Sequence, residues 1–295
     1  MLEVSCLKKL LTPEARRNAV KHIVEIFGRR LRGACSLIEI SRSVFNYKPA
    51  DRNDGVIRTR LKELAQEHRR WGCPQLHIQL RREGAIINHK RTERLYRLEG
   101  LMIRKRRRIK RASALRIKPP QADRINHVWA MDFVWDALTN NRRIKTFPII
   151  DTYTRESLAI EVDTSINAQR VIRILNDIAL KRGLPEIITI DNGPEFRSRA
   201  LDAWAYERGV KLHFITPGKP VENPFIESFN DKFRNECLND NCFFTILHAR
   251  DIIERWRMEY NQKRGHSSLG WITPEEFYRQ EMDKLTTQNH QELKS

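Results

Sequence analysis

Three acidic residues at the edges of apolar stretches limit what this chain can fold into. The apolar run Ile187–Ile190 ends at Asp191, where an Asn-Gly-Pro turn breaks the strand. A carboxylate at the end of a buried strand, followed by a glycine turn, is where open α/β sheets place their chemistry. Glu227 follows after 35 intervening residues and opens an expected helix, and Asp132 lies inside another strand-like run, Val128–Phe133. Acids from two strands and one helix can converge on a divalent cation, which prefers oxygen ligands.

From residue 126 onward, hydrophobic periodicity predicts alternating strands and helices. The expected order is three strands, a helix, a strand, a helix, a strand and a helix, at 127–138, 143–155, 156–164, 167–183, 186–191, around Leu201, 210–217 and from Asn223. The first three strands are expected to form an antiparallel meander, with a tight turn at 152–155. A further amphipathic helix, 245–261, is followed by a compact loop and by a helix start at Thr273-Pro274. This order indicates an α/β fold.

The sequence motifs around the three acids resemble those of a known family. WAMDF, IDNGPEF and NPFIESFNDKFRNE resemble the three acidic motifs of the DDE recombinases, which include transposases and retroviral integrases. PGKPVENPFIES and YNQKRGHSSLGWITPEEF look most like the catalytic reading frame of bacterial insertion-sequence transposases of the IS3 group, although that family usually carries Pro where this chain has Gly265. The resemblance covers nearly the whole chain. It implies a ribonuclease H-like integrase core with a mixed five-stranded sheet and helices, preceded by all-α helix-turn-helix segments.

The resemblance makes Asp132, Asp191 and Glu227 the expected catalytic and metal-binding residues, holding two Mg²⁺ or Mn²⁺ ions. Two such metals, roughly 3.5–4 Å apart, can activate a water or a 3′-hydroxyl and stabilise the leaving oxygen of a phosphodiester. The plainer alternative is that Asp191 caps the Asn-Gly turn and that Glu227 is a first-turn acid favoured by the helix dipole. Other acids at strand ends, among them Asp151, are expected to be turn or surface residues.

Charge is distributed unevenly along the chain. Residues 1–125 hold 32 Lys and Arg against 12 Asp and Glu, whereas residues 126–295 hold 23 against 25, and the whole chain has a net charge of +18. An excess this large and one-sided favours a polyanionic partner over a merely solvated surface. We therefore expect the N-terminal part to contact nucleic acid.

Two helical pairs are predicted in this basic part. A helix that starts at Thr12-Pro13 and ends at Gly28 precedes a short pair that suits either a helix-turn-helix or an ordinary helical pair. A second pair has Gly84 in its turn and Asn88 as the cap of its second helix, which is expected to bury Leu95 and Leu98. The resemblance places the family's helix-turn-helix region here, with a solvated face as the alternative.

We expect these cations to contact DNA: Lys90, Arg91, Arg94, Arg97, Arg104, Lys105, Arg106, Arg107, Arg108, Lys219, Arg234 and Arg264. The dense run 104–111 would bind a phosphate backbone regardless of sequence. Arg234 lies two helical turns beyond Glu227, and the resemblance implies contact with a DNA end there. The expected domains are a helix-turn-helix-like segment, a second such region, a basic linker, the catalytic core and a polar tail, at 1–48, 49–103, 104–124, 125–280 and 281–295.

Several other classes of protein are excluded by missing motifs. The chain has no P-loop, no zinc-finger spacing among its His and Cys residues, no secretory signal and no apolar run near the roughly 20 residues of a membrane span. Its five cysteines include no CxxC pair, and we expect free thiols in a bacterial cytoplasm, near the nucleoid.

The expected function is that of a DNA transposase. The resemblance implies that it binds the terminal inverted repeats of a mobile element, cleaves strands and transfers them to target DNA. It also implies a homo-oligomeric synaptic complex, with the product of an upstream reading frame as a partner or fusion. Two alternatives stay open: a catalytically silent DNA-binding protein, and a general nuclease of the same fold.

Overall fold

The computed structural model describes residues 12–47, 54–103, 121–216 and 222–292. The chain divides into two compact units, Met1–Val56 and Ile57–Ser295. The expected basic run 104–111 and Lys219 lie outside the described residues, as does the linker at 48–53. The domain boundaries proposed above stay predictions.

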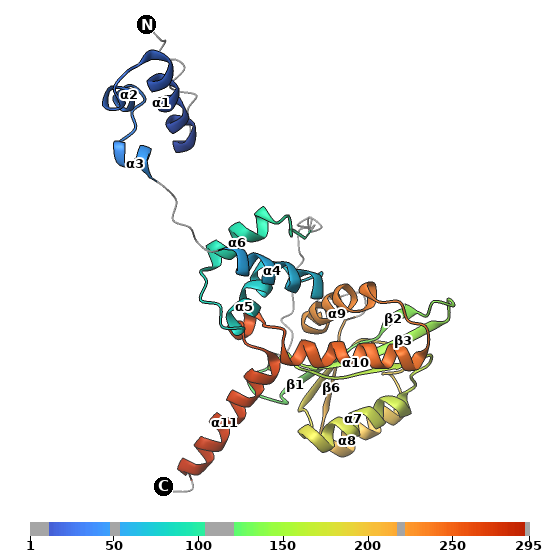
Figure 1. Cartoon of the computed structure of the whole chain (residues 1–295). Coiled ribbons are helices and arrows are strands. Elements are labelled where there is room, and N and C mark those ends of the chain that lie inside the picture. The colour runs from blue at the N-terminus through green and yellow to red at the C-terminus, as the bar shows by residue number, and fades with distance from the viewer. Residues whose placement is uncertain (1–11, 48–53, 104–120, 217–221, 293–295) are drawn as a thin grey trace. The chain divides into compact units, whose positions relative to one another are not determined.

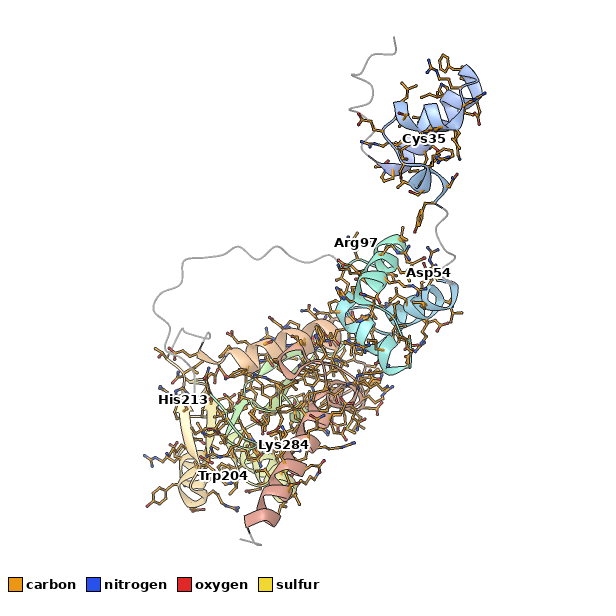
Figure 2. All side chains as sticks on the ribbon, turned by 90° about the vertical axis from the view of Figure 1, so that its left-hand side faces the viewer. Cys35, Asp54, Arg97, Trp204, His213 and Lys284 are labelled. Carbon is orange, nitrogen blue, oxygen red and sulfur yellow. The ribbon has the colours of Figure 1, made fainter. Side chains whose placement is uncertain are left out.

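The first unit contains helices α1 (Pro13–Phe27), α2 (Leu31–Leu37) and α3 (Arg42–Asn46). The predicted start of α1 is confirmed, because the Thr12 hydroxyl accepts a hydrogen bond from the Ala15 amide at 3.2 Å. Cys35, labelled in Figure 2, is buried with Val20 and Ala34 in a small apolar core. The sequence-based helices of this segment are therefore correct.

The second unit begins with three packed helices, α4 (Gly55–Glu67), α5 (Cys73–Arg82) and α6 (His89–Leu98). Asn88 caps α6 as predicted, accepting a hydrogen bond from the Lys90 amide at 3.0 Å. Leu95 is fully buried, but Leu98 is 62% exposed, so its predicted burial is wrong. Tyr96 instead joins Leu95 in the core that α6 shares with the leucines of α4 and α5.

The rest of this unit is built on a mixed sheet of strands β1 (Val128–Met131), β2 (Val134–Ala137), β3 (Arg143–Asp151), β4 (Ser157–Asp163), β5 (Ile187–Ile190) and β6 (Lys211–Phe214). Strand β3 pairs antiparallel with β1, β2 and β4, which confirms the predicted meander. Strand β5 lies parallel between β1 and β6. This is the order expected of a ribonuclease H-like core.

The single strand predicted over 127–138 is broken in the structure. Strands β1 and β2 pair with different parts of the long strand β3 and flank Asp132 and Phe133. The break has a local cause, since Asp132 Oδ1 accepts a hydrogen bond from the Phe133 amide at 2.7 Å and so withdraws that amide from the ladder. The two short strands thus occupy one position in the sheet, with an acid at their junction.

Helices cover both faces of the sheet (Figure 1). Helices α7 (Ala168–Arg182) and α8 (Arg199–Arg208) pack on one face, against side chains that include Trp129 and Phe147. Helices α9 (Pro224–Glu236) and α10 (Ile246–Gln262) pack on the other, against side chains that include Ala130 and Ile144. Alternate residues of β1 therefore enter different cores, as the pleat requires.

The C-terminal part contains the short helical turns η3 (Leu238–Asp240) and η4 (Ser267–Leu269) and the helix α11 (Pro274–Glu292). Helix α11 continues past residue 281, where we expected the folded core to end. Pairs one turn apart support it, since Arg279 bonds with Glu275 and Lys284 Nζ lies 2.6 Å from Glu281.

Helix α5 and the loop before α11 touch at Gly265. Its carbonyl accepts a hydrogen bond from Gln75 Nε2 at 2.6 Å, and a Cβ at this position would lie 2.7 Å from the carbonyl oxygen of Trp271. Nearby, Arg82 binds both carboxylate oxygens of Glu276. The close backbone approach leaves no room for a Cβ at this position.

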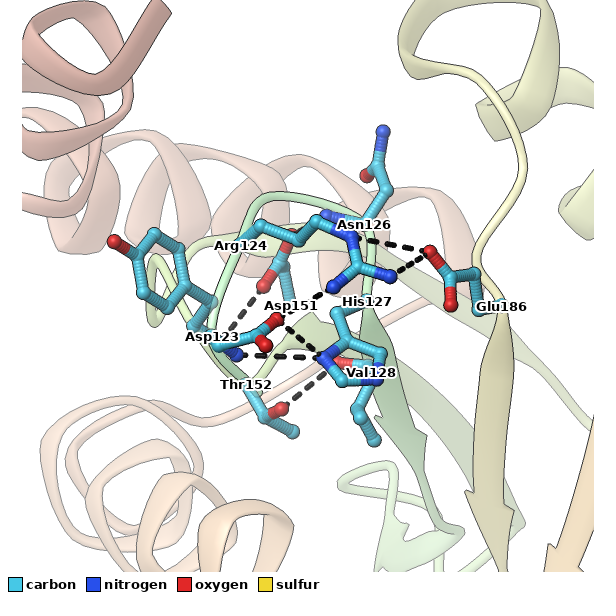
Figure 3. Close-up of polar contacts among 9 residues, drawn as sticks. Asp123, Arg124, Asn126, His127, Val128, Asp151, Thr152 and Glu186 are labelled. Carbon is cyan, nitrogen blue, oxygen red and sulfur yellow. Dashed lines mark hydrogen bonds and ion pairs between the residues drawn. The ribbon is translucent and has the colours of Figure 1, made fainter. Parts of the chain in front are cut away.

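The start of β1 is held by a polar network (Figure 3). The Asn126 amide donates to the buried carboxylate of Asp151 at 2.9 Å, and the Thr152 hydroxyl donates to the Val128 carbonyl at 2.8 Å. Arg124 pairs with Glu186, next to the start of β5. The network anchors one end of β1, and Asp132 follows the other end.

Two further expectations concern the cysteines and membrane-spanning segments. Four cysteines are free, as predicted: Cys35, Cys73, Cys237 and Cys242. Among the described helices, none is both long and apolar enough to cross a membrane. Cys6 lies outside the described residues.

Candidate active site

Asp132 stands at the junction of β1 and β2, with both carboxylate oxygens held by donors. Oδ1 accepts from the Phe133 amide at 2.7 Å, and Oδ2 accepts from Asn230 Nδ2 of α9 at 2.9 Å. The break in the strand thus aims an acid at the edge of the sheet instead of into a hydrophobic face. Its side chain is partly buried, so its charge is only weakly screened by water.

Asp191 follows the last residue of β5, the parallel neighbour of β1. Parallel neighbours end at the same edge of a sheet, which brings this acid to the side where Asp132 lies. Asp191 Oδ1 accepts a hydrogen bond from the Gly193 amide at 2.9 Å. A Cβ on Gly193 would lie 3.0 Å from that oxygen and 3.3 Å from Glu195 Oε2, so glycine leaves room for two carboxylates.

Glu227 lies in the first turn of α9, which starts with Pro224. Ile226, Phe229 and Phe233 are at most 1% exposed and press α9 onto the sheet, as the periodicity predicted. Packing of the helix therefore decides where Glu227 lies, and its side chain is partly buried.

Electrostatics link the three acids. Burial raises the pKa of Asp132 to about 6, the hydrogen bond from Phe133 opposes that rise, and the negative charges of Asp191 and Glu227 add to it. Like charges raise a carboxyl pKa in this way only when they are near. The structure therefore brings Asp132, Asp191 and Glu227 into one field, whose excess negative charge and oxygen donors fit a divalent cation. Within the described ranges, however, no three His, Cys, Asp or Glu side chains are already arranged as metal ligands.

An ion pair supports the loop after β5 and was missed by sequence analysis. Lys145 of β3, only 4% exposed at its side chain, pairs with Glu195, and its Nζ lies 3.5 Å from the centre of the Phe133 ring. Phe133 also stacks on Phe196 at 4.9 Å. The residues that follow Asp132 and Asp191 are thus tied together. The alternation of β3 marks Lys145 as a buried position, but no local signal names its partner.

Two more polar residues brace the same edge. Asn192 Nδ2 donates to the Ile215 carbonyl at 2.5 Å, which joins the ends of β5 and β6. Glu222, 8% exposed, accepts from the Thr216 amide at 2.7 Å. The second contact joins the residues on either side of 217–221, ahead of α9. Their positions beside the acidic motifs were the only sequence signal for them.

The expected DNA contacts of α6 are mostly exposed. Lys90 and Arg94 face solvent, Arg91 is partly buried, and Arg97, labelled in Figure 2, has a side chain that is 65% exposed. Arg97 Nη2 lies 2.5 Å from Glu93, one turn away on the same helix. Such an exposed pair contributes little to stability, and its cation remains accessible to a phosphate.

The remaining expected contacts differ among themselves. Arg234 is exposed on α9. Arg264 and Glu236 form an ion pair at 2.8 Å with both side chains 11% exposed, so this arginine is engaged within the fold and we leave it out of the proposed DNA surface. Lys219 and the basic run Arg104, Lys105, Arg106, Arg107 and Arg108 lie outside the described residues.

Comparison with protein families yields three matches along the chain. Integrase core domain families match residues 122–220 and residues 208–274. An HTH-like domain family matches residues 51–109. The first two ranges contain all three acids, and the third contains α4, α5 and α6.

Several proteins of bacterial mobile elements are similar over most of their length. The insertion element IS407 uncharacterized 31.7 kDa protein of Burkholderia multivorans is 47% identical over 88% of this chain and 93% of its own. The insertion element IS476 uncharacterized 39.2 kDa protein of Xanthomonas euvesicatoria is 45% identical over 91% of this chain and 78% of its own. The putative transposase InsK for IS150 of Escherichia coli is 28% identical over 82% and 91%.

Among solved structures, the HTLV-2 integrase catalytic core domain in complex with magnesium aligns with 53% of this chain and 99% of its own. The alignment has a TM-score of 0.42 at 16% identity.

Proposed function

This chain belongs to the insertion-sequence transposases of the IS3 group, and we propose that it is a DDE-type polynucleotidyl transferase in which Asp132, Asp191 and Glu227 form the catalytic site. The observation that carries the proposal is the placement of these acids, after two neighbouring parallel strands and in the first turn of α9, where the charges of Asp191 and Glu227 both raise the pKa of Asp132. Asp191 also caps the turn at Gly193, and this cap is compatible with the proposed role.

Divalent cations, Mg²⁺ or Mn²⁺, would be held by the three carboxylates and would supply charge neutralisation for phosphoryl transfer. The fold of the chain contributes the positions of the three carboxylates. Strands β1 and β5 fix the positions of the two aspartates, and α9 supplies the glutamate. The Lys145–Glu195 pair stiffens the loop after β5. No side chain needs to act as a covalent nucleophile, because a water or a 3′-hydroxyl can attack the phosphodiester.

A strand-joining assay tests this proposal. The full chain is mixed with labelled DNA carrying the two ends of its element, with Mg²⁺ present, beside Asp191→Asn and the control Asp202→Asn, which removes an exposed acid of α8. We expect joined products with the wild type and the control, and none with Asp191→Asn. Joining by Asp191→Asn would contradict the assigned site. Binding without joining would favour a silent DNA-binding protein, and cleavage without preference for ends a general nuclease.

We also propose that the exposed face of α6 contacts double-stranded DNA of the element ends, and that Arg234 lies near the cleaved end. The support is the exposure of Lys90, Arg94 and Arg97 on one helix of an HTH-like region. We expect Arg94→Ala to weaken DNA binding by about 1 kcal/mol and to reduce the salt slope by about one. The matched control is Arg255→Ala, which removes an exposed arginine of α10. Equal binding by both variants in gel-shift titrations would contradict this surface.

The active assembly is proposed to be a homo-oligomer that holds both element ends, with the upstream-frame product as a partner or fusion. The HTH-like and integrase core regions support DNA as the common ligand. Strand joining measured with and without the upstream frame tests the need for that partner.

A further inference from the structure

Asn230 connects the helix of Glu227 to the strand of Asp132. It lies three residues beyond Glu227 on α9, so the two side chains share one side of the helix. Its Nδ2 donates a hydrogen bond of 2.9 Å to Asp132 Oδ2, although 98 positions separate the two residues in sequence. The contact therefore ties Asp132 to the helix that carries Glu227 through a neutral amide.

The two oxygens of Asp132 are held by different kinds of donor. Oδ1 is held by the main-chain amide of Phe133 at 2.7 Å, which the break between β1 and β2 provides. Oδ2 depends on a side chain, Asn230, and on the packing of α9. With both oxygens engaged, rotation of the carboxylate about its Cβ–Cγ bond breaks at least one hydrogen bond.

Chemistry fixes the orientation of the Asn230 amide. A carboxylate accepts hydrogen bonds, so the NH₂ group must face Asp132 and the amide oxygen must point away. That oxygen, Oδ1, is buried and has no hydrogen-bond partner in the part of the chain that the structure describes. An unpaired buried acceptor costs roughly 1–3 kcal/mol, so this arrangement is unfavourable for stability alone.

We propose that Asn230 is a positioning residue that presets the Asp132 carboxylate for divalent-cation binding. The proposal rests on the assignment of Asp132, Asp191 and Glu227 as the metal site. A carboxylate already held in one orientation loses less freedom when a cation binds, and partners of this kind change metal affinity by about 10–100-fold. Because Asn230 lies on α9, its hydrogen bond also makes the position of Asp132 at the end of β1 depend on the position of α9, and hence of Glu227.

Two substitutions separate this role from a purely structural one. Asn230→Ala removes the amide and leaves a space, so it can lower stability as well as metal affinity. Asn230→Leu keeps a branched side chain of similar shape and removes the unpaired acceptor, but it also leaves Asp132 Oδ2 without its side-chain donor, so we expect it to be no less stable than Asn230→Ala. A structural role would change the melting temperature, whereas a positioning role changes the dissociation constant for the cation.

The experiment is a calorimetric titration of the full chain with Mn²⁺ in the absence of DNA, with thermal unfolding of each variant recorded beside it. We expect Asn230→Leu to weaken Mn²⁺ binding by about tenfold with a melting temperature no lower than that of Asn230→Ala. Asn235→Ala is the matched control, because Asn235 is an exposed amide of the same helix whose Nδ2 bonds to the Asp231 carbonyl. It should bind Mn²⁺ like the wild type.

The outcomes distinguish this inference from the function on which it rests. If the wild type binds Mn²⁺, Asp132→Asn abolishes binding and Asn230→Leu binds like the wild type, the positioning role is overturned while the metal site stands. If Asp132→Asn binds Mn²⁺ as tightly as the wild type, the metal site itself is wrong, and the role of Asn230 falls with it.

Discussion

Strand β1 has a partly or fully buried aspartate near each end, and the two differ in what surrounds them. Asp151, beside the start of β1, is fully buried and accepts hydrogen bonds from the amides of Asn126, Tyr153 and Thr154. Asp132, at the other end, has one main-chain donor and one side-chain donor.

Burial is the main cause of a raised pKa at both aspartates, but the other influences have opposite signs. At Asp151, three backbone hydrogen bonds and the positive charge of Arg182 all lower the pKa. At Asp132, the charges of Asp191 and Glu227 raise it further. The comparison teaches that burial alone does not mark a functional acid. An acid held by three main-chain donors stabilises a turn, whereas the negative charges near Asp132 support its proposed role in cation binding.

The largest expected difference between the two ends is in activity. Asp132→Asn removes a proposed metal ligand, which is worth several kcal/mol in the transition state, so we expect strand joining to fall about 10³-fold. Asp151→Asn should retain joining once equal amounts of folded protein are compared. Single-turnover joining rates measure both. A comparable loss of activity in the two variants would erase the proposed distinction.

The second-largest expected effect is on stability, and here the substitution at Asp151 has a larger effect than the one at Asp132. Asp151→Ala leaves one buried and two partly buried amides without their acceptor, and we expect the free energy of unfolding to fall by roughly 3 kcal/mol. Urea unfolding followed by tryptophan fluorescence measures it, with Asp283→Ala, an exposed acid of α11, as the control. A loss no greater than that of the control would show that the Asp151 network is dispensable.

An effect of pH on cation affinity is expected only at the Asp132 end of β1. Its pKa of about 6 lies above the ordinary 3.8, so below about pH 6 a proton competes with the cation. We expect Mn²⁺ affinity to be about tenfold lower near pH 5 than near pH 7, measured by calorimetry after folding is verified at both values. An affinity that does not change over this range would show that Asp132 is not the titrating ligand.

The smallest effect is a gain in stability. Because the pKa of Asp132 is raised, its contribution to stability is present below pH 3.8 and is lost as the pH rises through about 6. Asp132→Asn should therefore stabilise the metal-free protein by about 1 kcal/mol at neutral pH, with no gain near pH 3. Adding Mn²⁺ should reverse the order, since only the wild type gains from binding. Destabilisation by this substitution at neutral pH would argue that the charge of Asp132 is already compensated.

Local sequence signals predicted most of the elements correctly. Caps at Thr12 and Asn88, the apolar stripe of α9 and the run before Asp191 each act over a few residues, so their pattern is visible in the chain. The choice of acids came from the spacing and wording of the motifs, which single residues such as Asp151 do not carry.

By itself, then, the sequence determined the α/β order, the helical N-terminal part and the three acids at element ends, because periodicity, caps and turn residues act locally. Tertiary structure alone decided that Asn230 holds Asp132 and that Lys145 pairs with Glu195. It also decided that Leu98 is exposed. The contacts of Lys145 and Asn230 join residues that are 50 or more positions apart in the sequence. No local pattern encodes such a contact.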